Sequence, residues 1–225
     1  MNYRLTKSKF ILGLQCEKAL YLDVYKPNLA YYPPETLARF RKGRDFEAKV
    51  KALFPNAIDI SKQLGRNIQR YPELTTRMLE QPGEVNLYEA GFVYNEVLVL
   101  ADVVHKGADG NISVYEIKNS LSVKDVFRRD VSIQYYVISH CLSNIGSFSI
   151  IYNDGEDNPV YEELLLEARE AEPLIARHVE RFKDVLQGME PSIKTGTQCT
   201  VPYECPYARY CNGNVSAQLE LGCFQ

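Results

Sequence analysis

Three consecutive segments decide the fold of this chain: LYEAGFVY (87–94), EVLVLADVVH (96–105) and NISVYEIK (111–118). Each is rich in β-branched and aromatic residues, and turn signals separate them at 94–95 and 107–111. Segments of this kind are typical of β-strands joined by hairpins. We therefore expect three sequential strands in one sheet.

Helical patterns flank these strands on both sides. We expect helices over 8–24 (capped by Ser8), Glu35–Phe54, 71–80, 123–142 and 169–187, a short apolar piece AIDI (57–60), and further strands SFSIIYN (147–153) and VYEELLL (160–166). The central order is helix, three strands, helix, strand. This alternation predicts an α/β domain with a mixed sheet flanked by helices.

The bulk composition is that of an ordinary globular protein. The 225 residues are 45% hydrophobic and 24% charged, which fits a single domain over 1–225 with its core at about 35–153. No apolar run is long enough to span a bilayer, and no segment has the pattern of a targeting signal. We therefore expect a cytoplasmic protein without a membrane partner.

The charge pattern limits the possible partners. A net charge of −3 gives no global positive field for nucleic acid, so a polyanion would have to bind local basic patches. Two candidate patches are present: Arg39, Arg41, Lys42 and Arg44, and then Lys124, Arg128 and Arg129.

A carboxylate and an ammonium sit two residues apart at the end of the strand 111–118. Glu116 and Lys118 share one face of that strand, because alternate residues of a strand point the same way. If the loop is Gly107–Asn111, Lys106 faces Ile112 and Asp102 lies opposite Glu116. A tight turn at Asp109-Gly110 would instead place the two acids on different faces. We expect the longer loop, since it gives the three charges a shared environment.

Two opposed carboxylates repel each other, and one lysine compensates them only in part. A hard divalent cation such as Mg²⁺ resolves this repulsion and leaves room for a phosphate oxygen and an attacking water. Lys118 would orient or deprotonate that water, or offset charge that develops at phosphorus. The alternative is an ion pair across the end of a hairpin, which is a common arrangement.

The order of these motifs resembles the PD-(D/E)XK nuclease superfamily. The resemblance is to its RecB-like branch, and to the CRISPR-associated exonucleases that carry a cysteine-bound iron–sulfur cluster. The matching pieces are ADVV (101–104), EIK (116–118), GRDFE (43–47) and QYY (134–136), and they span about 5–212. The resemblance implies a restriction-endonuclease-like core.

The resemblance also implies roles for single residues. Asp102 and Glu116 would bind Mg²⁺ or Mn²⁺ together with the Ile117 carbonyl, and Lys118 would be the catalytic lysine. Glu47 would assist from its helix, one turn after Gly43, whose missing side chain would permit a close approach to the sheet. Gln134 and Tyr135 would contact the substrate phosphate or support the site. Ile138 stands where relatives often have a second tyrosine, which leaves the choice between Tyr135 and Tyr136 open.

Three of the six cysteines are evenly spaced in the tail GTQCTVPYECPYARYC (196–211). Three thiolates need a fourth ligand for a zinc ion or a four-iron cluster, and the resembling nucleases supply it from a helix near the start of the chain. A [4Fe–4S] cluster on Cys16, Cys199, Cys205 and Cys211 would hold the segment 191–212 to the helix 8–24. The first tail pair is separated by five residues where many relatives have two, so zinc, or thiols without metal, are the alternatives. Cys141 is expected to be a small apolar residue on a buried helix face, and Cys223 has no assigned role.

Together these patterns predict a metal-dependent deoxyribonuclease. It would act as an exonuclease on single-stranded DNA or DNA ends, in repair or in CRISPR adaptation, with protein partners from such a complex. The alternative is a nucleic-acid-binding or assembly module with a vestigial nuclease pocket. A third possibility is a metal-holding interaction protein with no nucleic-acid role.

Overall fold

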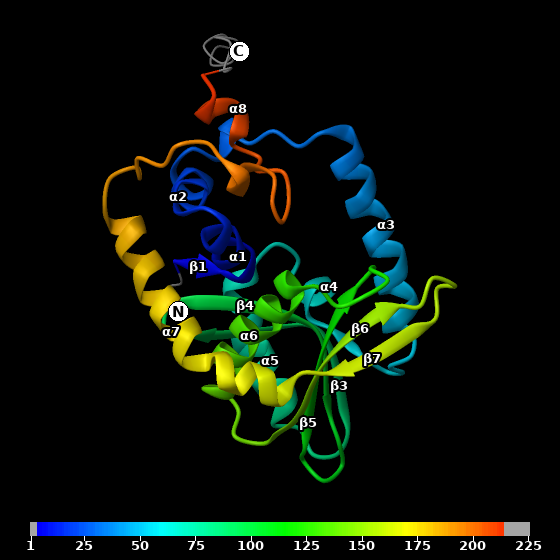
Figure 1. Cartoon of the computed structure of the whole chain (residues 1–225). Coiled ribbons are helices and arrows are strands. Elements are labelled where there is room, and N and C mark those ends of the chain that lie inside the picture. The colour runs from blue at the N-terminus through cyan, green and yellow to red at the C-terminus, as the bar shows by residue number, and fades with distance from the viewer. Residues whose placement is uncertain (1–3, 214–225) are drawn as a thin grey trace, which may run out of the picture.

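The computed structural model describes residues 4–213 and shows an α/β fold with a seven-stranded mixed sheet flanked by helices (Figure 1). The strands are β1 (Leu5–Thr6), β2 (Ile58–Asp59), β3 (Val85–Tyr94), β4 (Val97–Lys106), β5 (Ile112–Lys118), β6 (Ile145–Asn153) and β7 (Pro159–Glu163). The helices are α1 (Lys7–Gln15), α2 (Glu17–Tyr25), α3 (Pro34–Lys51), α4 (Ile60–Leu64), α5 (Tyr71–Leu79), α6 (Asp125–Ser139), α7 (Leu165–Gln187) and α8 (Ala208–Cys211), with short 3₁₀ turns at Pro27–Leu29, Ile68–Arg70 and Thr197–Cys199. The expected α/β class and mixed sheet are confirmed.

The sheet follows the order β2-β3-β4-β5-β6-β7, with β1 paired to β4 outside this path. Strands β3, β4 and β5 form an antiparallel meander, and α6 then crosses over so that β6 runs parallel to β5. The loop 107–111 has the longer form, because Lys106 pairs with Ile112 and the register runs on to Val103 opposite Tyr115. The expected register is therefore correct, and Asp102 and Glu116 are the next opposed residues.

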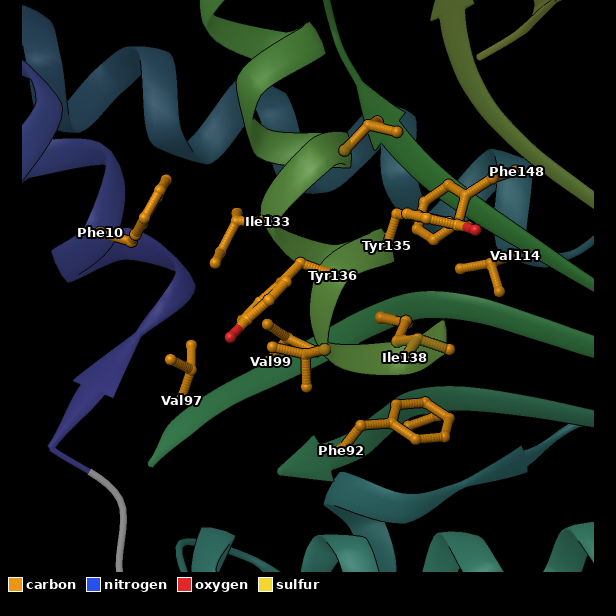
Figure 2. Close-up of a cluster of buried hydrophobic side chains, with 14 of the residues drawn as sticks. Phe10, Phe92, Val97, Val99, Val114, Ile133, Tyr135, Tyr136, Ile138 and Phe148 are labelled. Carbon is orange, nitrogen blue, oxygen red and sulfur yellow. The ribbon is translucent and has the colours of Figure 1, made fainter. Parts of the chain in front are cut away.

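The main core lies between α6 and the sheet, and Figure 2 shows Ile133 and Ile138 of α6 above Val99 and Phe92. On the opposite face Phe46 and Val50 of α3 pack on Val103, Ile117 and Ile151. The two faces follow from strand alternation, since Ile117 and Ile151 are out of phase with Val114 and Ile150 of the main core. The end of β5 is therefore covered from both sides, by α6 and by α3.

The N-terminal helix differs from the expectation. A single helix over 8–24 is wrong, because the chain is extended at Cys16 (φ −163°, ψ 117°) and divides into α1 and α2. The cap is Thr6 rather than Ser8, since the Thr6 hydroxyl accepts a hydrogen bond from the Lys9 amide at 3.3 Å. At the break, Gln15 Nε2 donates to the main-chain carbonyls of Gln198 and Tyr203, at 2.8 and 2.7 Å. These contacts come from the distant C-terminal segment, so a prediction from the helix propensity of neighbouring residues does not include them.

Close approach of helix and sheet occurs at Gly91 rather than at Gly43. A Cβ on Gly91 would lie 2.5 Å from the Tyr71 Cβ, whereas a Cβ on Gly43 would meet nothing within 4 Å. The expectation for Gly43 is therefore wrong: its missing side chain is not needed for packing.

We predict that Gly91→Ala lowers the free energy of unfolding by about 1–3 kcal/mol, because backbone of α5 would have to move. Thermal denaturation should show a melting temperature lower by about 3–10 °C. Gly43→Ala is the matched control and should leave stability unchanged or slightly higher, since alanine favours an open helical position. Equal melting temperatures for Gly91→Ala and wild type would contradict this packing.

Candidate functional site

Glu116 of β5 is the centre of a buried cluster of charges. Its side chain is 1% exposed and accepts hydrogen bonds from three donors. Lys7 Nζ lies 2.9 Å from both carboxylate oxygens, Gln134 Nε2 lies 2.8 Å from Oε2, and Lys118 Nζ contacts Oε1. Two of these donors, Lys118 and Gln134, are among the residues predicted for the site.

Asp130 of α6 is a member of the cluster that sequence reasoning missed. It lies one helical turn before Gln134, so both side chains face β5. Its Oδ2 accepts a hydrogen bond from Lys118 Nζ at 2.6 Å, and its Oδ1 lies 3.8 Å from Lys7 Nζ. Oδ1 of Asp130 and Oε1 of Gln134 are buried and have no hydrogen-bond partner among residues 4–213. The i, i+4 spacing of Asp130 and Gln134 was the available signal.

The lysines and acids of this cluster shift one another's pKa values. Burial alone would raise the pKa of Glu116, but Lys118 and Lys7 outweigh it and hold that pKa well below its usual range. Burial would lower the pKa of Lys118, yet Asp130 and Glu116 keep it well above its usual value. In this arrangement Lys118 is an ammonium, which suits charge stabilisation rather than proton abstraction.

Asp102 has the opposite character. Burial, with the negative charge of Glu116, raises its pKa to about 8 in spite of Lys7 and Lys118. Its Oδ2 accepts a hydrogen bond at 2.7 Å from the amide of Ile117, which ties it to the backbone between Glu116 and Lys118. Asp102 is therefore a carboxyl group with too few positive partners.

Asp102 also belongs to an acidic group with Glu47 of α3 and Glu89 of β3. Carboxylate oxygens of these three residues lie within 4.8 Å of one another, a spacing that could accommodate a metal ion. Lys51 contacts both glutamates, at 2.5 Å to Glu47 and 2.7 Å to Glu89. Glu89 has a positive φ of 55°, an uncommon backbone state for a residue with a side chain.

The predicted metal ligands are therefore only partly brought together. Asp102 and Glu47 share one acidic group, while Glu116 lies beside it, bound to lysines. Ile117 touches Asp102 through its N–H rather than its carbonyl. Glu89 and Lys7 were missed. The one hint for Glu89 is a carboxylate within an otherwise apolar strand, and nothing in the sequence around Lys7 marks it.

Tyr135 is in the hydrophobic core rather than among these charges. Its ring packs edge-on against Phe148 with centroids 6.4 Å apart, and Figure 2 shows it directed toward Phe148 and Val114. Its hydroxyl accepts a hydrogen bond from Arg169 Nε at 3.3 Å. The ring of the neighbouring Tyr136 packs edge-on against Tyr94, and its hydroxyl accepts a hydrogen bond from Asn95. The structure thus places neither tyrosine with Gln134 at Glu116.

The four predicted cysteines come together at the other end of α1. Cys16, Cys199, Cys205 and Cys211 line one small pocket, and in Figure 1 the tail before α8 lies beside α1 and α2. Tyr207, which is fully buried, donates from its hydroxyl to Asp23 at 3.0 Å and fixes the tail on α2. Burial, reinforced by the other three sulfurs, raises the pKa of Cys205 to about 11.

The spacing of the sulfurs bears on which metal group would fit. A tetrahedral zinc ion at about 2.3 Å from each sulfur needs sulfurs about 3.8 Å apart. The four thiols line the same pocket, and either group would take all four of them as ligands. A cluster that contains its own iron and sulfide holds its thiolates farther apart.

Two other predictions have different outcomes. Cys141 is exposed and follows the end of α6, so its expected place on a buried helix face is wrong. Cys223 lies outside the described residues. None of the described helices is long and apolar enough to cross a bilayer.

Comparisons with known proteins do not name a family. No protein-family model matches the chain, and no curated protein matches it. A solved structure described as the crystal structure of SSO0001 is 16% identical, with a TM-score of 0.49, over 94% of this chain and 87% of that chain. The function must therefore be argued from the site.

Proposed function

We propose that this protein is a metal-dependent deoxyribonuclease of the PD-(D/E)XK type, in its RecB-like branch. One observation carries the proposal: the register of β4 and β5 sets Asp102 beside Glu116 and Lys118, with the Ile117 amide bonded to Asp102. Gln134 reaches Glu116 from α6, as the resemblance implies. The order of α3, β3–β5, α6 and β6 supports a restriction-endonuclease-like core.

The side chains present fit a hard divalent cation. Asp102 has a raised pKa, and Glu47 and Glu89 supply two further oxygens close by. Glu116 would complete the set once a lysine releases it. Mg²⁺ or Mn²⁺ bound here would activate a water and offset phosphate charge. Lys118, kept as an ammonium by Asp130, would stabilise negative charge on the phosphate that is cleaved.

The surroundings support a nucleic-acid substrate. Arg41, Lys42 and Arg44 are exposed on α3, and the Lys42 carbonyl accepts a hydrogen bond from Asn119 at the end of β5. These cations would guide the phosphate backbone toward Lys118. Arg128 of the second basic patch is instead paired with Glu162 and Glu167. We propose single-stranded DNA or DNA ends as substrate, acted on from the ends.

A [4Fe–4S] cluster on Cys16, Cys199, Cys205 and Cys211 is the second part of the proposal, with zinc as the alternative. The meeting of four free thiols at one pocket supports a metal group there, and a reducing cytoplasm would keep these thiols available. Its role would be structural: it joins the two ends of a single domain. Such a protein would serve in DNA repair or in a CRISPR adaptation complex.

The test is cleavage of end-labelled single-stranded DNA with Mg²⁺ or Mn²⁺. We expect cleavage that a chelator stops, and its loss in both Asp102→Ala and Lys118→Ala. Activity that persists in both variants excludes this site. Circular dichroism of each variant shows whether the fold is kept.

A nucleic-acid-binding module with a vestigial pocket is the second candidate. The observation that favours it is that lysines already form ion pairs with the carboxylates of the site. Lys7 and Lys118 pair with Glu116, and Lys51 pairs with Glu47 of the acidic group. Binding of DNA without turnover, in protein free of contaminating nucleases, would select this candidate. If the protein binds neither DNA nor RNA at low salt, where phosphate contacts are strongest, the remaining hypothesis is an interaction protein with no nucleic-acid role.

A further inference from the structure

Lys7 is a half-buried cation that the sequence did not mark. It is the first residue of α1, its side chain is 18% exposed, and its ammonium lies 2.9 Å from both oxygens of Glu116. Glu116 comes from β5, more than a hundred positions later in the chain. The contact therefore joins the N-terminal helix directly to the proposed metal site.

The carboxylate of Glu116 has no free place for a metal ion. It receives two contacts from Lys7, one from Lys118 and one from Gln134. A carboxylate has about four lone-pair directions, and these four contacts occupy all of them. A cation can bind Glu116 only if one donor leaves.

Lys7 is the donor that has a second acceptor nearby. Lys118 is already shared between Glu116 and Asp130, and the Gln134 side chain is held within a fully buried position on α6. Oδ1 of Asp130 is buried, has no hydrogen-bond partner in the part of the chain that the structure describes, and lies 3.8 Å from Lys7 Nζ. A shift of about 1 Å would bring Lys7 to hydrogen-bond distance of that oxygen.

We infer that Lys7 is a positioning residue that occupies Glu116 until a divalent cation binds, and then transfers to Asp130. This inference rests on the proposed function, since it takes Glu116 as a metal ligand. The transfer leaves no ammonium buried without a partner, which would otherwise be costly. It also gives Asp130 Oδ1 the hydrogen bond that it lacks.

The test measures Mn²⁺ affinity of the full chain by titration calorimetry without DNA. Lys7→Met should bind Mn²⁺ about tenfold tighter or more, because a competing positive charge is gone. Lys7→Arg, which keeps the charge, should stay within about threefold of wild type. Lys9→Met, the same change two residues along α1, is the matched control and should equal wild type.

Asp130→Asn gives a second, independent arm. It should weaken Mn²⁺ binding at least about fivefold in the wild-type background, because Lys7 loses its second position. In the Lys7→Met background the same change should have less than about a twofold effect, since the lysine that would transfer is absent and Lys118 is present in both backgrounds. Equal effects in both backgrounds would overturn the inference.

Nitrogen NMR of lysine side chains covers the case in which Lys7→Met does not fold. In the wild-type chain, the Lys7 signal, assigned from Lys7→Arg, should shift on addition of Mg²⁺. If Mg²⁺ binds and the Lys7 signal does not shift, the inference about Lys7 is wrong but the proposed metal site is not. Absence of Mn²⁺ binding to wild type overturns both the inference and the proposed metal site, so the two failures are distinguishable.

Discussion

Asp102→Asn is expected to abolish metal-dependent cleavage, with a fall in kcat of at least about 10³-fold. Asparagine keeps the shape of the side chain and can still accept the hydrogen bond from the Ile117 amide. It removes the charge that Asp102 shares with Glu47 and Glu89. Single-turnover kinetics at saturating Mg²⁺ would measure the effect. Cleavage within tenfold of wild type would refute the role of Asp102.

The same variant is expected to stabilise the metal-free protein. The pKa of Asp102 rises from 3.8 to about 8 on folding, so the folded state binds a proton that the unfolded chain has released. Wild type therefore loses stability relative to Asp102→Asn as the pH rises from about 4 to 8. Because Asp102 keeps some solvent contact, we expect a gain of about 1–3 kcal/mol at pH 8.

Chemical denaturation in a chelator, at pH 4.5 and pH 8, would show this difference. The gap between the two proteins should be small at the lower pH and larger at the higher one. Added Mg²⁺ should then stabilise wild type but not Asp102→Asn. An equal difference in the free energy of unfolding at both pH values would show that ionised Asp102 does not destabilise the folded protein.

Cys16→Ala is expected to cause the largest loss of stability. It removes one of four thiols around a pocket that joins α1 and α2 to the tail. By analogy with the removal of a native cross-link, the cost should be about 2–5 kcal/mol, or about 5–15 °C in melting temperature. Iron and zinc analysis of anaerobically purified protein should show metal in wild type and little in the variant.

Cys141→Ala is the matched control for this experiment, because Cys141 is exposed and outside the pocket. It should keep both the metal content and the melting temperature of wild type. Metal content that is equal in Cys16→Ala and Cys141→Ala would remove Cys16 from the ligand set. A zinc count without iron would replace the cluster by the alternative ion.

Loss of Cys16 should also affect the acidic site. Lys7 is the first residue of α1 and Cys16 directly follows its last residue, so one short helix joins the two sites. If the tail no longer holds Cys16, α1 is less well fixed and Lys7 is less well placed at Glu116. Mn²⁺ affinity in Cys16→Ala should therefore move toward that of Lys7→Met.

Local pattern was sufficient for the strands around Asp102 and Glu116. Alternation of apolar residues marked β3, β4 and β5. Loop spacing allowed two registers, and the one expected because it gives the three charges a shared environment, with Lys106 opposite Ile112, is the one observed. Gln134 was found from its motif, and it does reach Glu116. The strands and their register depend on neighbours in sequence or on one hairpin, whereas Gln134 came from the family resemblance.

Features that depend on distant segments were missed or misplaced. The helix break at Cys16 coincides with the contact of Gln15 with the tail, which helix propensity does not include. Tyr135 was assigned to the site from its place beside Gln134, but on α6 adjacent residues point about 100° apart. Tyr135 therefore turns into the core against Phe148.

The sequence by itself determined the α/β class, because periodicity encodes which residues share a face. The hairpin register was one of two that the sequence allowed, and the family resemblance, not spacing, added Cys16 to the three tail cysteines. Only the tertiary structure decided which charges surround Glu116. Lys7 reaches it from α1, Asp130 of α6 pairs with Lys118 beside it, and Glu89 joins Asp102 and Glu47 from β3. Contacts of this kind arise when separate elements pack against one sheet, and the distances between their side chains are properties of that packing.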